Sequence, residues 1–390
     1  MLLYKIKQKV ILKILLTILL LEIVIGGGGR FIEIAGLSLK MIFFTIAIVI
    51  SLLSVRKIKN DILLKILFFL LLLLSIATCI GITTGAKTTL IFSDLSPLLF
   101  FFIIPFFSLV INDYNDIIYV VKIIKLGTSI LAFLYLLLLI LLYREIIDFT
   151  QFYAWGNARG EIFFRPGSYM FFYKGFLYLC IGFFFHMITI RSLKDKVITA
   201  LIYLSIVLTL SRGLILMTSI VYIFYILFIS KKKWLKFFLF LFGIIAFIYL
   251  LPVYLEAIGD KSASDQVRID TFDQVIDRIN IFTIFIGQGF GNGVPIRPER
   301  MEISYLEIFH KQGILGLSFW VILLFLNFYL CHKIKKHREI ALAFVLSVCF
   351  VYLQSFTNPF VNNPIGISII TLSIVCMYKM CLLEKSIFKT

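Results

Sequence analysis

The chain has 390 residues, of which 61% are apolar and only 15% are charged. A soluble domain typically has about 45–50% apolar and about 25% charged residues, so this composition excludes a soluble enzyme, a disordered protein and a secreted disulfide scaffold. The apolar residues form long runs separated by short charged clusters. This arrangement is typical of a polytopic membrane protein.

Twelve apolar runs predict an all-α polytopic protein with about 12 transmembrane helices, forming a single integral membrane domain over 1–390. Ser211-Arg212-Gly213, between the short seventh and eighth runs, indicates either a loop or a kink within a longer helix. The runs are 10–25, 39–55, 62–82, 95–111, 126–147, 169–190, 197–210, 214–230, 237–255, 304–330, 340–356 and 365–378.

The first run follows three lysines, as in a signal peptide, but no A-x-A cleavage site follows it. The tetraglycine 26–29 leads directly into the second run. We therefore expect a retained signal anchor.

Cysteine and histidine residues offer no pattern for a metal site. All six cysteines lie within or at the ends of apolar runs, and no pair has C-x-x-C spacing. The four histidines are scattered along the chain. We expect no metal and no cofactor.

The distribution of charge predicts the orientation in the membrane. One set of loops, which includes both termini, carries 24 Lys and Arg against 6 Asp and Glu. The opposite set carries 14 Lys and Arg against 15 Asp and Glu. Because positive loops stay in the cytoplasm, both termini are predicted to be cytoplasmic, and the net charge of +17 reflects topology and requires no nucleic-acid partner.

Two long outward loops, 143–168 and 256–303, are the expected functional insertions. The second contains apolar residues with helical spacing over 265–281, which predicts an amphipathic helix on the membrane surface or over a cavity. The glycine-rich run 287–293 follows and suits close backbone approach. The alternative interpretation is a plain loop with a docked helix.

Five cations are expected near the outer face of the bilayer. A charged residue between apolar spans, such as Arg212, is by default a candidate functional residue. Because arginine binds phosphate oxygens through paired N–H groups, such a cluster suits a lipid diphosphate. Alternatively, each cation extends to the interface or pairs with a nearby acid. The five are Arg212, Arg165, Lys174, Arg268 and Arg278.

The start of the tenth run contains the candidate bases. Glu302 precedes the run, and His310 is the one histidine expected near the outer surface. Either is a candidate to remove a proton from a sugar hydroxyl. Glu307 has a simpler alternative, an ion pair with Lys311 at i,i+4.

Four features together resemble the superfamily of O-antigen polymerases (Wzy-type) and O-antigen ligases, which are bacterial membrane glycosyltransferases. They are the hydrophobic N-terminal half with Gly26–Arg30, the Ser211–Gly213 break, Arg278 followed after ten residues by Gly289, and the stretch Glu302–Gly316. Glu302 stands where ligases have histidine, which favours the polymerase.

The resemblance implies a GT-C-like fold and an inverting, metal-independent transfer of a growing glycan from undecaprenyl diphosphate to the non-reducing end of a lipid-linked repeat unit. The product would be O-antigen or capsule, made at the outer face of the bacterial cytoplasmic (inner) membrane. The implied partners are undecaprenyl-diphosphate-linked donor and acceptor oligosaccharides and membrane lipid, and a chain-length regulator protein is a further candidate.

Within this frame the expected catalytic residues are Glu302, Arg212, Arg278 and His310. The expected substrate-binding residues are Arg165, Lys174, Arg268, Tyr169, Tyr305 and Gly289. Tyr169 and Tyr305 are candidates to stack on sugars, although aromatic residues at a membrane interface explain them equally well. The alternative functions are an O-antigen ligase and a flippase or other transporter of lipid-linked oligosaccharides.

Overall fold

The structure of the chain is a computed structural model that describes residues 2–29, 33–34, 37–54, 61–164, 168–229 and 262–387. The first helices are α1 (Leu2–Ile25), α2 (Leu39–Leu53), α3 (Asp61–Thr83), α4 (Thr88–Leu98), α5 (Ile104–Val110), α6 (Tyr114–Tyr143) and α7 (Phe149–Arg159), with the 3-10 segment η2 (Leu99–Ile103) between α4 and α5. The later helices are α8 (Leu177–Ile188), α9 (Leu193–Leu208), α10 (Arg212–Phe224), α12 (Ser262–Ile276), α13 (Ile281–Ile286), α14 (Ser304–Lys333), α15 (Arg338–Gln354) and α16 (Pro364–Ile387), and the π-helical segment η4 (Tyr225–Ile229) continues α10.

The described residues confirm a helical, polytopic membrane protein. Six of their helical segments are long and apolar enough to cross a membrane: Ile62–Thr83, Thr88–Val110, Tyr114–Tyr143, Arg212–Ile229, Ser304–Lys333 and Pro364–Lys385. Leu39–Leu53 and Lys174–Ile188 are apolar but shorter. A helix overlaps each predicted run in the described part of the chain, and run 237–255 lies outside it.

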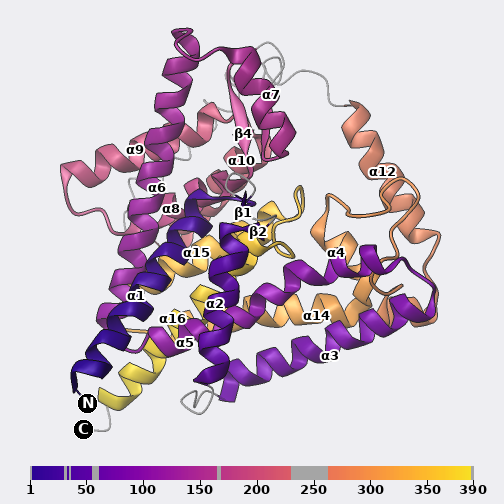
Figure 1. Cartoon of the computed structure of the whole chain (residues 1–390), viewed down its shortest axis with the longest axis horizontal. Coiled ribbons are helices and arrows are strands. Elements are labelled where there is room, and N and C mark those ends of the chain that lie inside the picture. Colours follow the sequence, from indigo (N-terminus) through magenta and orange to yellow (C-terminus); the bar gives the residue numbers. More distant parts are fainter. Residues whose placement is uncertain are drawn as a thin grey trace.

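Helix α16 forms the centre of the bundle. The most hydrophobic window of its span is 83% buried, against 33% for the spans of α6 and α14. It packs against α14, α15 and the segment from α4 to α5. Around it, α1 lies beside α6, and the long helix α14 lies beside α3 (Figure 1).

Contacts between loops agree with the two predicted sets. At the end where α1 begins, Lys13 forms an ion pair with Asp116 (2.6 Å), and both belong to the positive set. At the opposite end, the Gly28 amide donates to the Glu161 carboxylate (3.1 Å), and both belong to the other set. Segments predicted to share a side of the membrane therefore meet in space.

The predicted span 169–190 is wrong at its start. Phe171–Tyr173 forms strand β4, which pairs antiparallel with β3 (Ile162–Phe164), and the 3-10 turn η3 (Lys174–Phe176) leads into α8. A short apolar run does not distinguish a strand from a helix by its periodicity. A second small sheet, β1 (Glu33–Ile34) with β2 (Leu37–Ser38), follows the tetraglycine turn. Both hairpins are departures from the all-α prediction.

The structure decides between the two alternatives at residues 211–213 and shortens the predicted helix 265–281. Leu210 has a positive φ of 49° and Ser211 is extended, so α9 and α10 are separate helices joined by a loop. The predicted helix 265–281 corresponds to α12, but α12 ends at Ile276, and Asn280 then caps a separate helix, α13. On α12, Val275 is buried, whereas Ile269 is 55% exposed, so its apolar residues do not all face the bundle.

Candidate active site

The first turn of α14 is the point where three elements meet. The Ser304 amide donates to the Ser355 carbonyl after α15 (3.1 Å), and Ser304 Oγ donates to Asn362 Oδ1 before α16 (3.1 Å). The Tyr305 hydroxyl donates to the Tyr352 carbonyl of α15 (2.7 Å). These bonds fix the direction of α14 and therefore the positions of the side chains on either side of its first turn.

Glu302 lies directly before this turn and contacts two arginines. One carboxylate oxygen accepts from Arg268 Nε of α12 (2.8 Å) and the other accepts from a terminal nitrogen of Arg297 (2.6 Å). Arg268 also pairs with Asp265 (2.8 Å), whose side chain is 57% exposed. Ion pairs exposed to this degree contribute little to stability. We therefore consider what these charged side chains could bind, since their contribution to stability is small.

Arg268, Arg297 and Glu302 line a pocket between α12 and the start of α14, with an empty volume of about 220 Å³ that includes its open mouth. We call it the Arg268 pocket. Its lining has two guanidinium groups and one carboxylate, and Asp265, which is not part of the lining, pairs with Arg268. Guanidinium groups bind phosphate oxygens with paired N–H donors and stay charged at any biological pH. The pocket therefore suits an anion.

The glycine loop, residues 287–293, packs its backbone against α3 and reaches α4. Gly289 has φ +83°, and a Cβ placed there would lie 2.4 Å from the Gly81 amide nitrogen of α3. Two residues later, the Gly291 amide donates to Asp94 Oδ2 of α4 (2.8 Å). Only glycine fits this approach without displacing backbone, as the run of glycines indicated.

The glycine loop also fills a break in α14. Gly313 has φ +64° and ψ −161°, which are not helical values. The carbonyls of His310 and Lys311, just before the break, accept hydrogen bonds from the amides of Gln288 (2.7 Å) and Gly289 (3.1 Å). A helix break inside a membrane protein is tolerated when other groups satisfy the freed carbonyls, and the glycine loop does this here.

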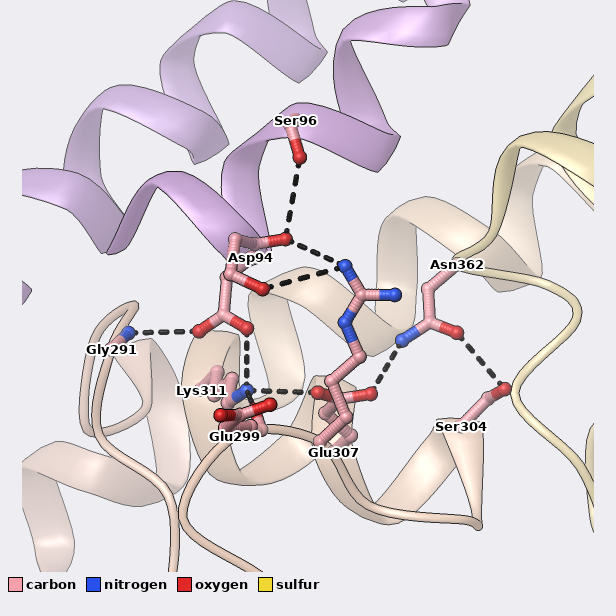
Figure 2. Close-up of polar contacts among 10 residues, drawn as sticks. Asp94, Ser96, Gly291, Glu299, Ser304, Glu307, Lys311 and Asn362 are labelled. Atoms are coloured by element: carbon pink, nitrogen blue, oxygen red, sulfur yellow. Dashed lines mark hydrogen bonds and ion pairs between the residues drawn. The ribbon is translucent and has the colours of Figure 1, made fainter. Parts of the chain in front are cut away.

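Lys311 forms the centre of a buried charge cluster (Figure 2). Its Nζ donates to Asp94 Oδ1 (2.7 Å), Glu307 Oε1 (2.8 Å) and the Glu299 carbonyl (2.9 Å). The second oxygen of Glu307 accepts from Asn362 Nδ2 (2.8 Å). The i,i+4 pair of Glu307 and Lys311 considered from sequence is therefore present, and it has a third charged member.

The three charged side chains are almost completely buried, with exposures of 3% for Lys311, 5% for Asp94 and 7% for Glu307. Burying charges is costly unless they are paired and their remaining lone pairs are satisfied. Here the Gly291 amide and the Asn362 side chain supply those hydrogen bonds. Among the residues described, no group of three or more His, Cys, Asp or Glu side chains is arranged to hold a metal ion.

A second pocket opens beside this cluster. Asp94, Glu307, Lys311 and Arg300 supply its charged lining, and its empty volume is about 410 Å³ including the mouth. We call it the Asp94 pocket. It lies against Glu307 and Ile308, whereas the Arg268 pocket lies against Leu306, so the two pockets adjoin α14 near its first turn.

Among the residues predicted for the site, Arg278, His310 and Gly289 gather around the glycine loop. Arg278 lies beyond the end of α12 and donates to the Gly293 carbonyl (2.8 Å), while its own carbonyl accepts from Gln288 Nε2 (2.7 Å). His310 is 4% exposed and lines neither pocket. These residues build the loop that reaches Asp94, whereas Arg268 and Glu302 form the other pocket.

Arg212 belongs to the same end of the molecule. It is the first residue of α10, and a Cβ on the next residue, Gly213, would lie 2.6 Å from Gln354 Nε2 at the end of α15. The residue after Gln354 is Ser355, whose carbonyl accepts from the Ser304 amide. The start of α10 thus lies close to the elements that hold the first turn of α14.

Tyr169 lies between β3 and β4, and Lys174 directly follows β4; the β3–β4 hairpin lies beside α7 and away from α12 (Figure 1). Lys174 Nζ lies 5.7 Å from the centroid of the Phe163 ring, and the Tyr169 ring packs edge-on against Phe149 at 5.3 Å. The structure does not bring these two predicted residues to either pocket. Arg165, also predicted, lies outside the described residues.

Comparison with known proteins gives a match along almost the whole chain. The chain is 29% identical over 377 residues to an O-antigen polymerase of Shigella flexneri, and the match covers 94% of both proteins. No family model matches the chain. The chain is a homologue of an O-antigen polymerase. The homology identifies it as an enzyme and agrees with the resemblance seen in its motifs.

The sequence patterns of this O-antigen polymerase homologue do not reveal several residues that line the two pockets, among them Asp94, Arg297, Arg300, Gln312 and Asn362. One signal was present, because Lys311 is a charge inside an apolar run, which usually marks a functional or paired residue. Its partner Asp94 is 217 positions away in the sequence, and no local pattern reveals such a pair.

Proposed function

We propose that the chain is a polysaccharide polymerase, making O-antigen or capsule, that transfers a growing glycan from undecaprenyl diphosphate to the non-reducing end of a lipid-linked repeat unit. The observation that carries this proposal is the Arg268 pocket, in which two guanidinium groups surround one carboxylate at the start of a membrane-spanning helix. The homology to an O-antigen polymerase supports it.

In the proposed reaction, a hydroxyl oxygen of the acceptor sugar attacks the anomeric carbon of the donor from the face opposite the diphosphate. The new glycosidic C–O bond forms as the bond from the anomeric carbon to the phosphate oxygen breaks, so the configuration inverts. The electron pair of the broken bond leaves with the lipid diphosphate. Arg268 and Arg297 stabilise the charge that develops there, and guanidinium groups do so without a metal ion.

Glu302 is the proposed base that takes the proton of the acceptor hydroxyl. Each of its oxygens accepts one hydrogen bond from an arginine, and a carboxylate oxygen has a second lone pair that remains for the hydroxyl. The two arginines also keep Glu302 in place. His310 is the weaker candidate, because it lines neither pocket.

Arg278 and Arg212 have supporting roles in this proposal. Arg278 holds the glycine loop through the Gly293 carbonyl (2.8 Å), and Arg212 starts α10 beside the end of α15. The start of α14 also presents the positive end of a helix dipole, which favours an anion nearby. We place both pockets on the outer face of the bacterial inner membrane in a GT-C-like helical architecture, with both termini in the cytoplasm.

Complementation of a bacterial strain that lacks its own polymerase tests the proposal. Cells expressing the native chain should display long polysaccharide, whereas Glu302→Gln and Arg268→Ala should leave single repeats attached to the lipid A core. Gln151→Ala, on the exposed face of α7, is the control that should retain long chains. Loss of all attached repeats, with each variant present in the membrane at the native level, would indicate a ligase and contradict the proposal.

A further inference from the structure

The Asp94 pocket has a different chemical character from the Arg268 pocket. Its charged lining is two carboxylates, Asp94 and Glu307, and two cations, Lys311 and Arg300, so its net charge is zero. The Arg268 pocket instead has two guanidinium groups and one carboxylate in its lining, and Asp265, which is not part of the lining, pairs with Arg268. Because guanidinium groups bind phosphate oxygens with paired N–H donors, the Arg268 pocket fits a diphosphate better, and the Asp94 pocket fits an uncharged polar ligand.

Polar groups in the Asp94 pocket are fixed before any ligand arrives. Hydrogen bonds run from Ser304 to Asn362, from Asn362 to Glu307, and from Lys311 to both carboxylates (Figure 2). Carboxylates and amides held in this way present oriented acceptors and donors. Such groups recognise hydroxyl groups by position, since little side-chain freedom is lost when the ligand binds.

Gln312 supplies an independent indication of a ligand. Its side chain lines the Asp94 pocket, and the residue is only 8% exposed. Within the part of the chain that the structure describes, its amide group forms no hydrogen bond. A glutamine amide that lines a pocket and has no protein partner is available to hydrogen-bond a ligand hydroxyl there.

The remaining walls of the Asp94 pocket are apolar and include Pro97, Leu98, Phe290 and Pro359. Its empty volume of about 410 Å³ includes the open space at its mouth. A sugar ring combines hydroxyl groups at its edge with C–H groups on its faces, so it matches a pocket of this mixed lining.

We propose that the Asp94 pocket is a binding subsite for an uncharged sugar of the lipid-linked glycan, with Gln312 and Asn362 as hydrogen-bonding residues and Lys311 as the residue that positions both carboxylates. This inference rests on the proposed function, which it deepens by assigning glycan and diphosphate to separate pockets. The first turn of α14, which adjoins both pockets, is then the place where the glycosidic bond is exchanged.

Binding of two separate probes to the purified protein in detergent micelles tests the inference. One probe is the repeat-unit oligosaccharide, released from its carrier by mild acid and therefore free of phosphate; the other is undecaprenyl diphosphate without sugar. Gln312→Ala should weaken oligosaccharide binding about three- to tenfold, the value of one hydrogen bond, and leave undecaprenyl diphosphate binding unchanged. Arg268→Ala should have the reverse effect.

Gln312 has no hydrogen bond to lose in the described structure, so Gln312→Ala should fold, and Asn362→Ala serves as a second variant. Gln151→Ala makes the same change of side chain at an exposed position on α7 and should bind both probes as the native chain does. Native affinity of Gln312→Ala and Asn362→Ala for the oligosaccharide, or no oligosaccharide binding by the native chain, would overturn the inference.

The same variants separate this inference from the function on which it rests. Oligosaccharide binding that depends on Gln312, in a protein that never elongates a glycan, would contradict the polymerase and support the subsite. Elongation that proceeds normally in Gln312→Ala would contradict the subsite and leave the polymerase intact.

Discussion

Lys311→Met should destabilise the protein strongly, because it removes the one cation between two buried carboxylates. Methionine keeps most of the side-chain volume but leaves Asp94 and Glu307, which are 5% and 7% exposed, without their shared partner. Removing one member of a buried ion pair typically costs about 3–5 kcal/mol. We expect the upper part of that range, since the lysine also donates to the Glu299 carbonyl.

The protein contains its own reporters for this measurement. Cys180 and Cys376 are fully buried, so a thiol-reactive fluorophore reaches them only when the bundle opens, whereas Cys79 is exposed and gives the starting signal. Thermal unfolding of a membrane protein is often irreversible, so midpoints should be compared at one heating rate. Lys311→Met should have a clearly lower midpoint than the native chain.

A double-mutant cycle identifies the cause. Asp94→Asn should cost less in the Lys311→Met background than in the native chain, because it removes one of the uncompensated charges there. We expect a coupling of at least about 1 kcal/mol, as found for residues in one ion-pair network. An unchanged midpoint for Lys311→Met, or strictly additive effects in the cycle, would refute the reasoning.

Two further predictions concern the residues around this cluster. Gly289→Ala should unfold at a lower temperature than Gly85→Ala. Both glycines have positive φ, but a Cβ at Gly289 would lie 2.4 Å from backbone, whereas a Cβ at Gly85 would meet nothing within 4 Å. Equal losses of stability in the two variants would contradict the close approach at Gly289. Tyr305→Phe should lose about 0.5–1.5 kcal/mol of stability, the value of its hydrogen bond to the Tyr352 carbonyl, with an unchanged KM for the lipid-linked acceptor. A raised KM with unchanged stability would instead indicate that Tyr305 contacts the substrate.

Hydrophobic runs and charge distribution predicted much of the architecture. The described helices overlap the predicted runs, and loops assigned to one side of the membrane contact each other, as Gly28 and Glu161 do. The glycine loop was also recognised, because its composition indicates close backbone approach. These features depend on local composition, which a sequence shows directly.

The arrangement of the pockets depends on contacts between distant segments, and the sequence could not show it. Glu302 was expected at the site, but its pairing with both Arg268 and Arg297 requires α12 and α14 to pack together. Lys174 lines neither pocket, and the apolar residues before it form a strand where a helix was equally plausible. Its predicted substrate-binding role stays a prediction.

The most direct test of the polymerase is an assay with purified protein and undecaprenyl-diphosphate repeat units, with EDTA present and no nucleotide. The account predicts a ladder of longer lipid-linked glycans that is absent in Glu302→Gln and in Arg268→Ala. Movement of intact lipid-linked oligosaccharide across a liposome bilayer, without any ladder, would contradict the account and indicate a transporter.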